Sequence, residues 1–382
     1  MPALDFNVFH RDELPARLAT DDGLRAARDV RGVGALAFRL PDGRAYTYTA
    51  AGDCIAIDAG DATAETVVAL DEADWRRFVD ELATAAGLVH GGRARFPRGG
   101  YAHLERWEPA LRMLFVGRPI YDPTALKVPD RLDRSFALDD PGLATFLRAT
   151  GFALVKRVFA TDEVSRLRAA AERLADDAVP GDRRSWWTRT ADGADVLSRI
   201  TYAGVRAPVI GALDDDARLR RLAALAGDDL RPAGDRCDGH SLVIKHGGVA
   251  EGLGDLPWHR DCGLGGHPVM CPSLQIGIQL DAATADSGRL LFLAGSAGVS
   301  CHRSALDRGP IVAVDTEPGD CTVHFGDVLH AAPPPARPGR GRRALYVSFF
   351  PARTFAAIPA GRGYNDLLLS RDDGLVAADA PA

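Results

Sequence analysis

The fold is decided by the stretch Pro257-Trp258-His259-Arg260-Asp261, which places an imidazole and a carboxylate two residues apart. If this stretch is extended, His259 and Asp261 point to the same side, because strand side chains repeat every two residues. A further imidazole, His330, follows 71 positions after His259 at the end of an apolar run. Two His and one Asp in this order form a donor set that holds a divalent iron and leaves coordination positions open. The pattern therefore predicts a strand-mounted metal site formed by His259, Asp261 and His330.

The sequence around this stretch is rich in short apolar runs separated by Gly, Pro and Asp. Runs of this kind at regular spacing are typical of a double-sheet jelly roll, the barrel of the cupin type. We therefore predict a double-stranded β-helix whose strands come from the following segments: 241–245, 274–280, 288–293, 311–314, 321–325 and 344–350.

The segment ahead of these strands predicts the helices that open the same domain. Residues 141–150 and 216–226 carry apolar side chains at helical spacing, and Thr161 is the predicted N-cap of a longer helix. A strand is expected at 151–159, between the first and second of these helices. The pair Trp186-Trp187 follows, and these side chains either line an apolar substrate pocket or pack in the core.

The N-terminal part of the chain differs in pattern, and the sequence predicts two domains. Residues 1–128 are expected to form a small α+β accessory domain, and residues 129–382 the β-rich domain. Asp42-Gly43 indicates a hairpin turn between apolar runs, and Asp71 is the predicted N-cap of an amphipathic helix. The predicted fold class is therefore α+β, with an accessory domain followed by a double-stranded β-helix.

The end of the accessory domain is predicted to contain a loop and a closing helix. Residues 91–100 are rich in Gly and Arg and are expected to be a loop. A helix is expected at about 103–115, where Pro109 either introduces a kink or marks the true start. The arrangement of residues 33–116 resembles a sterol-carrier-protein-like module, which implies a lipid-binding role. The alternative is an accessory domain with an ordinary core.

Composition limits the partners and the location that the sequence predicts. The net charge is −6 without a basic block, so a nucleic-acid partner is not expected. No segment reaches the about 20 apolar residues of a membrane span, and no apolar signal region is expected at the N-terminus. The six cysteines form no Cys-x-x-Cys pair, which favours reduced thiols and a cytoplasmic protein. Cys262 is expected to be a small neutral neighbour of the metal site, with a zinc or redox role as the alternative.

Several stretches between Phe146 and Phe350 occur in one order that resembles the phytanoyl-CoA dioxygenase family. The resemblance implies a non-haem oxygenase that uses Fe(II), 2-oxoglutarate and O2. The stretches are 146–164, 242–245 leading into 257–261, 280–296, 319–330 and 342–349.

Matched residue by residue, the resemblance makes His259, Asp261 and His330 the iron ligands and the catalytic residues. It makes Arg342 the anchor for the far carboxylate of 2-oxoglutarate, a role that suits a planar two-pronged donor. Arg343 is the alternative, and only one of the two can enter the barrel because neighbouring strand residues face opposite sides. Lys245 resembles a lysine that helps to hold 2-oxoglutarate, with a surface position as the alternative.

The sequence also departs from the family pattern. Ala297 stands where the family has a histidine, and Ala332 replaces a small hydroxyl residue after His330. Asp261 is retained, which argues against a halogenase, because a halide would need that coordination position. The remaining histidines of this region are expected to be structural, with His267 the nearest in sequence to the site; they are His240, His246, His267, His302 and His324.

These observations predict an oxidoreductase acting on a small molecule. We expect a dioxygenase that hydroxylates a C–H bond of an apolar or secondary-metabolite substrate, while 2-oxoglutarate is decarboxylated to succinate. One alternative is a cupin-type metal enzyme that does not use 2-oxoglutarate. Another is a non-catalytic, lipid-binding carrier. The sequence indicates neither the substrate nor the oligomeric state.

Overall fold

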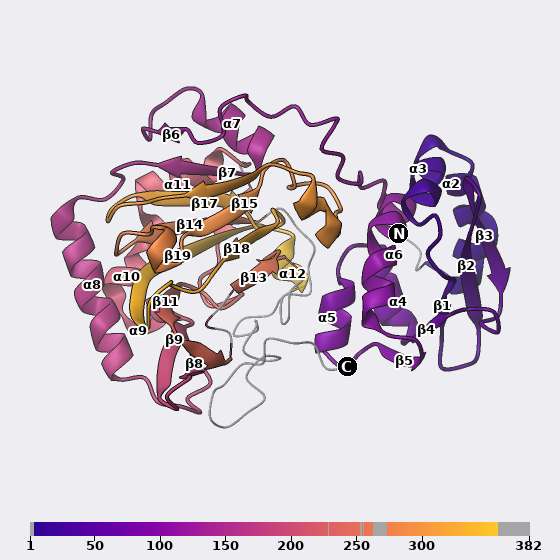
Figure 1. The fold of residues 1–382 in the computed structure, drawn as a ribbon, viewed down its shortest axis with the longest axis horizontal. Coiled ribbons are helices and arrows are strands. Elements are labelled where there is room, and N and C mark those ends of the chain that lie inside the picture. The colour runs from indigo at the N-terminus through magenta and orange to yellow at the C-terminus, as the bar shows by residue number, and fades with distance from the viewer. Residues whose placement is uncertain (1–3, 228, 253, 255, 263–272, 358–382) are drawn as a thin grey trace.

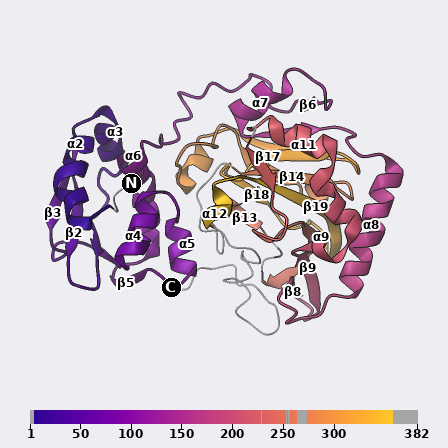
Figure 2. The same cartoon turned by 180° about the vertical axis from the view of Figure 1, so that it is seen from behind.

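The computed structural model describes residues 4–227, 229–252, 254, 256–262 and 273–357. Figures 1 and 2 show two bodies, one built from the elements up to α6 and the other from all later elements. The first body has one sheet and the second has two, and each body has a large hydrophobic cluster of its own. The predicted α+β class is confirmed, whereas the exact boundary at residues 128 and 129 stays a prediction.

The N-terminal sheet has the strand order β3-β2-β1-β4-β5. The predicted hairpin at Asp42-Gly43 is present, because β1 and β2 pair in antiparallel fashion and Gly43 has a φ of 89°. β5 lies within the segment that was expected to be a loop, and its mostly exposed edge position explains why it lacks apolar alternation. The strands are β1 (Leu36–Arg39), β2 (Ala45–Ala51), β3 (Cys54–Ala59), β4 (Thr66–Ala69) and β5 (Arg95–Arg98).

Helices pack against this sheet and bury aromatic side chains such as Trp75 and Trp107. The carboxylate of Asp71 caps α4 by accepting the backbone N–H of Asp74 at 2.7 Å, as predicted. α6 begins at Tyr101, so Pro109 lies inside the helix and does not mark its start. The helices are α1 (Phe6–Val8), the π-helical η1 (Phe9–Glu13), α2 (Leu14–Leu18), α3 (Asp21–Asp29), α4 (Glu72–Val79), α5 (Ala85–His90) and α6 (Tyr101–Val116).

Two sheets form the predicted jelly roll, and all the strands predicted for it are present. The larger sheet has the order β12-β8-β9-β11-β19-β14-β17-β7-β6, with β10 also paired to β19, and the smaller has the order β13-β18-β15-β16. The larger sheet comprises β6 (Ser135–Phe136), β7 (Phe152–Val155), β8 (Ser185–Thr190), β9 (Asp195–Ile200), β10 (Leu230–Pro232), β11 (Ser241–Gly247), β12 (Val249–Glu251), β14 (Leu274–Gln279), β17 (Cys321–Phe325) and β19 (Gly339–Pro351). The smaller comprises β13 (Leu256–His259), β15 (Leu290–Leu293), β16 (Ile311–Val314) and β18 (His330–Ala332).

Helices cover the outer face of the larger sheet, as Figure 2 shows for α8 and α11. α8 begins at Thr161, but its N-cap is Ala160, so the predicted capping residue was wrong by one position. The carboxylate of Glu163 accepts the backbone N–H of Ala160, which is the half of a capping box that does not need an N-cap side chain. The helices are α7 (Leu143–Thr150), α8 (Thr161–Asp176), α9 (Ala203–Arg206), α10 (Pro208–Gly211), η2 (Ala212–Asp215), α11 (Ala217–Ala224), η3 (Ala285–Ser287), η4 (Arg303–Asp307) and α12 (Thr354–Ala357).

Successive side chains of β19 point alternately toward the covering helices and toward the pocket. Leu345 and Val347 belong to the hydrophobic cluster shared with α8 and α11, whereas Tyr346 and Ser348 line the pocket between the two sheets. This is the period of two that an extended strand imposes on side chains. One face of the larger sheet therefore packs in the hydrophobic core, and the other lines the pocket, where it can contact small molecules.

The hairpin of β8 and β9 was not predicted by the sequence, although it forms one end of the pocket. Trp186 lines the pocket and Trp187 packs against the hydrophobic core, so each of the two predicted roles applies to one of the tryptophans. In the part of the chain that the structure describes, no helix is long and apolar enough to cross a membrane.

Candidate metal centre

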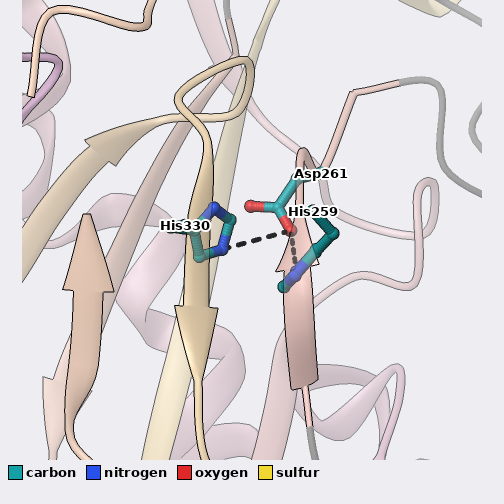
Figure 3. A group of neighbouring side chains, drawn as sticks. All are labelled: His259, Asp261 and His330. Atoms are coloured by element: carbon teal, nitrogen blue, oxygen red, sulfur yellow. Dashed lines mark ion pairs between the residues drawn. The ribbon is translucent and has the colours of Figure 1, made fainter. Parts of the chain in front are cut away.

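His259, Asp261 and His330 come together in the pocket, where β13 pairs with β18 (Figure 3). His259 and His330 are direct partners across the two strands. Their Nε2 atoms lie 3.6 and 3.9 Å from Oδ1 of Asp261. One potential ligand atom from each residue lies within 4.8 Å of the others. This convergence of two imidazoles and one carboxylate is the arrangement that a single cation requires.

Backbone contacts orient both imidazoles. Nδ1 of His259 lies 2.6 Å from the carbonyl oxygen of Pro257, and Nδ1 of His330 lies 3.1 Å from that of Val328. An Nδ1–H that donates to a carbonyl leaves Nε2 without a proton, and Nε2 is the nitrogen that faces the cluster. The donor set therefore fits Fe(II), which binds neutral imidazole and carboxylate and retains open positions.

Burial and the neighbouring side chains together set the pKa values of the residues in the cluster. Burial and the neighbouring His259 lower the pKa of His330 to about 3, so this imidazole is neutral at pH 7. Burial alone would raise the pKa of Asp261, but the surrounding histidines, His330, His259 and His324, hold it well below its usual range. A neutral imidazole and an ionised carboxylate are the forms that bind metals.

His324 is a pocket residue whose contact with the metal cluster sequence reasoning missed. It was expected to be structural, yet its Nε2 lies 3.3 Å from Oδ2 of Asp261 and its side chain is buried. This contact holds one carboxylate oxygen and leaves Oδ1 facing His259 and His330. The signal was available, because His324 alternates with Val323 and Phe325 on β17 and must face the opposite side of the sheet.

Arg342 and Lys245 are adjacent buried cations on neighbouring strands, where they are direct partners in the pairing of β19 with β11. Arg342 is 1% exposed, and its Nε donates to the carbonyl of Gly288 at 2.9 Å. Its Nη1 is buried without a hydrogen-bond partner within the described residues. The ammonium group of Lys245 donates to the carbonyls of Gly254 and Ala332 at 2.6 and 2.7 Å. Two buried like charges with an unused donor fit a bound carboxylate.

Arg343, the alternative anchor, lies on the opposite face of β19. Its guanidinium is paired with the carboxylate of Asp281 at 2.8 Å and with Glu172 of α8 at 3.0 Å. The hydrogen bond with Asp281 raises the pKa of this arginine. Because its donors are occupied by these carboxylates, Arg343 is a structural residue of the layer between sheet and helices.

The end of the pocket formed by Trp186 is polar as well as aromatic. The guanidinium of Arg199 lies over the ring of Trp186 at 4.6 Å, and its Nη2 donates to the hydroxyl of Ser241 at 3.0 Å. Apolar side chains, including Val243 and Leu256, also line the pocket. The pocket therefore offers both apolar surface and hydrogen-bond donors.

His240, His246 and His302 lie outside the metal cluster. Nε2 of His240 contacts Asp214 at 3.2 Å, and Nε2 of His246 lies 3.0 Å from the carbonyl of Leu197. Nδ1 of His302 lies 3.1 Å from the hydroxyl of Ser304. His267 lies outside the described residues.

Comparison with solved structures gives similar proteins at low identity. AviO1 from Streptomyces viridochromogenes Tue57 is 27% identical, with a TM-score of 0.47, over 59% of this chain and 100% of AviO1. EctD from S. alaskensis, solved with bound Fe, is 23% identical with a TM-score of 0.47, over 62% of this chain and 84% of EctD. The non-heme alpha ketoglutarate dependent epimerase SnoN from nogalamycin biosynthesis is 22% identical with a TM-score of 0.46, over 56% of this chain and 84% of SnoN.

The family assignment comes from the sequence of the barrel. No curated protein matches the chain. The sequence model of the phytanoyl-CoA dioxygenase family matches residues 147–344, which contain the three clustered residues and both buried cations. The match covers just over half of the chain. The chain therefore belongs to the phytanoyl-CoA dioxygenase family, whose members are oxygenases that use Fe(II), 2-oxoglutarate and O2.

Proposed function

We propose that this protein is a 2-oxoglutarate-dependent hydroxylase acting on a C–H bond of a small organic molecule, with His259, Asp261 and His330 as its Fe(II) ligands. The observation that carries the proposal is the convergence of these donors in one pocket, with Nε2 of both histidines turned toward the carboxylate. When bound, Fe(II) with 2-oxoglutarate and O2 supplies the oxidising power for C–H cleavage, at the expense of decarboxylating 2-oxoglutarate to succinate.

We further propose that Arg342 binds the far carboxylate of 2-oxoglutarate and that Lys245 supports it. The buried Nη1 of Arg342, which has no hydrogen-bond partner among the described residues, supports this role, because a carboxylate would satisfy it and would compensate two adjacent positive charges. Hydrogen bonds to two backbone carbonyls hold the ammonium group of Lys245 between residue 254, which precedes β13, and residue 332, the last residue of β18. We expect Lys245 to act mainly through charge.

The substrate is proposed to be a small molecule with an apolar frame and at least one hydrogen-bond acceptor. Val243 and Leu256 supply apolar surface in the pocket, while Arg199 and Ser241 supply donors. This refines the expectation of an apolar or secondary-metabolite substrate. A cytoplasmic location is part of the proposal, supported by the reduced thiols of Cys54, Cys237, Cys301 and Cys321.

The test is to add Fe(II) and then 2-oxoglutarate to the metal-free protein without oxygen and to record the visible absorption that this pair develops. Arg342→Ala removes a charge-assisted bond of about 1.5–3 kcal/mol, so 2-oxoglutarate should bind roughly 10- to 100-fold more weakly. Arg343→Ala is the matched control, because it removes the neighbouring guanidinium from the other face of β19 and should leave the absorption unchanged. His259→Ala should abolish it.

The outcomes separate the proposal from its alternatives. Tight Fe(II) binding without any effect of 2-oxoglutarate would favour a cupin-type metal enzyme of another kind. Retained lipid without Fe(II) binding would favour a carrier. With a substrate in hand, a mass gain of one oxygen atom in the product, together with one succinate formed, would distinguish hydroxylation from desaturation or ring closure.

A further inference from the structure

The segment that leaves the N-terminal body runs directly along a loop beside the metal centre. The backbone N–H of Tyr121 donates to the carbonyl of Ser300 at 2.7 Å, and the N–H of Ser300 donates to the carbonyl of Pro119 at 2.7 Å. The ring of Tyr121 is buried, and it shares a hydrophobic cluster with Leu293 and Leu329. Since Leu329 precedes His330, the connecting segment packs against a residue next to a proposed ligand.

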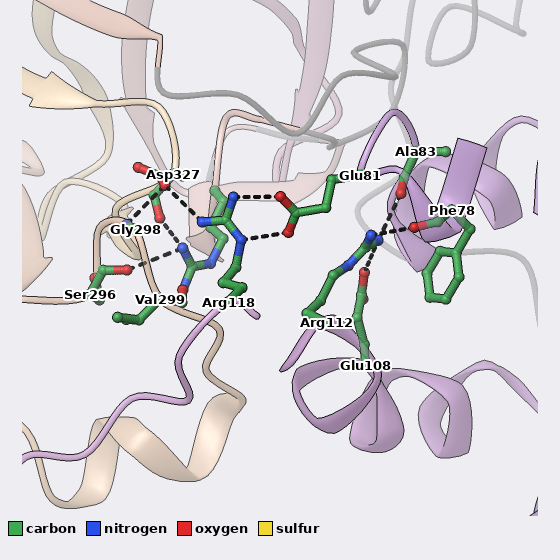
Figure 4. A network of polar contacts seen from close by, with 11 residues as sticks. Phe78, Glu81, Ala83, Glu108, Arg112, Arg118, Ser296, Gly298, Val299 and Asp327 are labelled. Carbon is green, nitrogen blue, oxygen red and sulfur yellow. Dashed lines mark hydrogen bonds and ion pairs between the residues drawn. The ribbon is translucent and has the colours of Figure 1, made fainter. Parts of the chain in front are cut away.

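An ion network crosses the interface at the same place (Figure 4). Arg118, just after α6, forms a two-pronged pair with Glu81, with Nε–Oε1 and Nη2–Oε2 distances of 2.5 and 2.8 Å. Nη1 of Arg118 lies 3.6 Å from Oδ2 of Asp327. The side chains of Arg118 and Glu81 are each 15% exposed, and that of Asp327 is 4% exposed. Arg118 therefore joins carboxylates of both bodies in a largely buried setting.

The position of Glu81 is fixed from within the N-terminal body. Glu81 lies in the turn after α4 with a φ of 57°, which is uncommon for a residue with a side chain. Arg112 of α6 is fully buried and donates to the carbonyls of Phe78 and Ala83 at 2.5 and 2.7 Å, on both sides of this turn. Glu108 pairs with Arg112 at 2.9 Å. The turn that presents Glu81 to Arg118 is thus held by a buried arginine.

On the other side, Asp327 is connected to all three proposed ligands. It lies three residues before His330, and its backbone carbonyl accepts a hydrogen bond from Arg260, the residue between His259 and Asp261. Arg260 also donates to the carbonyls of Ser296 and Val299 at 3.2 and 3.0 Å. The side chain of Arg260 therefore holds the two ligand-bearing segments together.

The Asp327 carboxylate requires compensation because it is buried. Its Oδ2 accepts the N–H of Gly298 at 2.9 Å, while Oδ1 has no hydrogen-bond partner within the described residues. Among those residues, Arg118 is the only cation paired with this carboxylate. Removing one partner of a buried pair leaves an uncompensated charge, which the structure must relieve by moving or by protonation. Movement here would displace the segment that carries His330.

We infer that the N-terminal body is a positioning element of the metal centre, and that Arg118 and Asp327 are the positioning residues through which it acts. This inference rests on the proposed function, because it presumes that His259, Asp261 and His330 bind the metal. The contacts place the N-terminal body beside the loop of residues 326–330 and connect it, through Arg118 and Asp327, to the Arg260 side chain that links the two ligand segments.

The test measures metal binding in the full chain without turnover. Co(II) is titrated into metal-free wild type, Arg118→Ala and Arg118→Lys, and its visible absorption reports affinity and coordination. Loss of a group that directly contacts a metal ligand costs about 10- to 100-fold in affinity, and Arg118 acts one contact further out, so we expect Co(II) binding to be about 10-fold weaker in Arg118→Ala. Arg118→Lys retains the charge and should recover most of this loss.

Controls separate positioning from general stability. Arg131→Ala removes an exposed arginine of the connecting segment, paired with Asp133, and should leave Co(II) binding unchanged. Asp327→Asn keeps the shape of the side chain and should weaken Co(II) binding as Arg118→Ala does. Hydrogen exchange of residues 326–330 should accelerate in both variants, while the α8 amides keep their protection.

Each outcome is decisive. If wild type binds Co(II) and both Arg118→Ala and Asp327→Asn bind it equally well, the inference is wrong and the proposed function stands. If Arg118→Ala does not fold, Asp327→Asn and Arg118→Lys decide the question by the same titration. If wild type does not bind Co(II) or Fe(II), the proposed function fails and takes the inference with it.

Discussion

Two buried histidines, His10 in the N-terminal core and His330 in the pocket, share much of their local chemistry. Burial lowers the pKa of His10 to about 4 and that of His330 to about 3. In each, Nδ1 contacts a backbone carbonyl, of Phe6 at 2.6 Å and of Val328 at 3.1 Å. Burial and a shifted pKa therefore do not distinguish a structural histidine from a metal ligand.

The two histidines differ in what their Nε2 atoms meet. Nε2 of His10 lies 2.8 Å from the hydroxyl of Tyr48, and its ring stacks on Tyr46 at a centroid distance of 4.2 Å. Nε2 of His330 faces Asp261 at 3.9 Å, and the ring of His259 lies 4.3 Å away. A buried imidazole with both nitrogens satisfied stabilises a fold. A buried imidazole whose Nε2 faces a carboxylate and a further imidazole can instead bind a cation together with them.

The sharpest test of this difference is His330→Ala. Removing a direct ligand should weaken Fe(II) or Co(II) binding by more than the about 100-fold that loss of an outer partner can cost. Equilibrium dialysis against either metal measures the change. Unaltered binding would show that the pocket holds its metal through another donor set.

The matching substitution is His10→Ala, which should produce the opposite pattern. Truncating a buried ring leaves a cavity, and the hydroxyl of Tyr48 loses its partner, so we expect the N-terminal body to lose about 3 kcal/mol. Urea unfolding followed by tryptophan fluorescence would measure this loss. Metal affinity of the folded protein should stay within about twofold of wild type, well below the 10-fold that an outer partner costs. A large fall in affinity would make His10 more than a core residue.

His324 provides an intermediate case, because its Nε2 contacts the carboxylate oxygen of Asp261 that faces away from the two histidines. His324→Phe keeps an aromatic ring and removes this contact. We expect about 10-fold weaker Co(II) binding, since the carboxylate can then rotate away from its ligating position. His246→Phe, which changes a histidine bonded to the carbonyl of Leu197, is the control. Equal affinities in the two variants would assign His324 to packing alone.

The smallest expected effect is that of changing Glu163, whose carboxylate makes hydrogen bonds far from the metal centre that stabilise the fold. Hydrogen bonds from Arg218 and from the N–H of Ala160 lower the pKa of Glu163 from 4.5 to about 2. Because the folded pKa is the lower one, the stabilisation is complete above pH 4.5 and declines as the pH falls toward 2. With screening by solvent, Glu163→Gln should cost about 1 kcal/mol at pH 7. Urea midpoints of both proteins between pH 7 and pH 3 should converge at the acidic end, with metal affinity at pH 7 unchanged.

Much of the barrel could be predicted because strand alternation and motif order are local properties. The same alternation that separated Arg342 from Arg343 also applies to His324, between Val323 and Phe325. The role of His324 was missed because its position in the sequence does not indicate which residue it contacts across the barrel. The edge strand β5 was missed because exposed positions need no apolar pattern.

The contacts between the two bodies could not be predicted from the sequence. Arg118 and Asp327 are far apart in the chain, and each lies in a segment with other charged residues nearby. Their proximity depends on how the N-terminal body packs against the barrel, which no local pattern encodes. The same holds for Tyr121, whose partners Leu293 and Leu329 come from β15 and the segment before β18.

The docking of Tyr121 has a practical consequence for any attempt to produce the barrel by itself. A shortened protein that starts at residue 129 would contain the whole family match but would lack Arg118 and Tyr121. Leu293 and Leu329 would lose their cover, and newly exposed apolar surface promotes self-association. Poor yield of such a fragment would therefore be no evidence against an autonomous barrel. The residues that cover the apolar surface of the barrel begin at Arg118 or earlier, ahead of the domain boundary that the sequence predicts between residues 128 and 129.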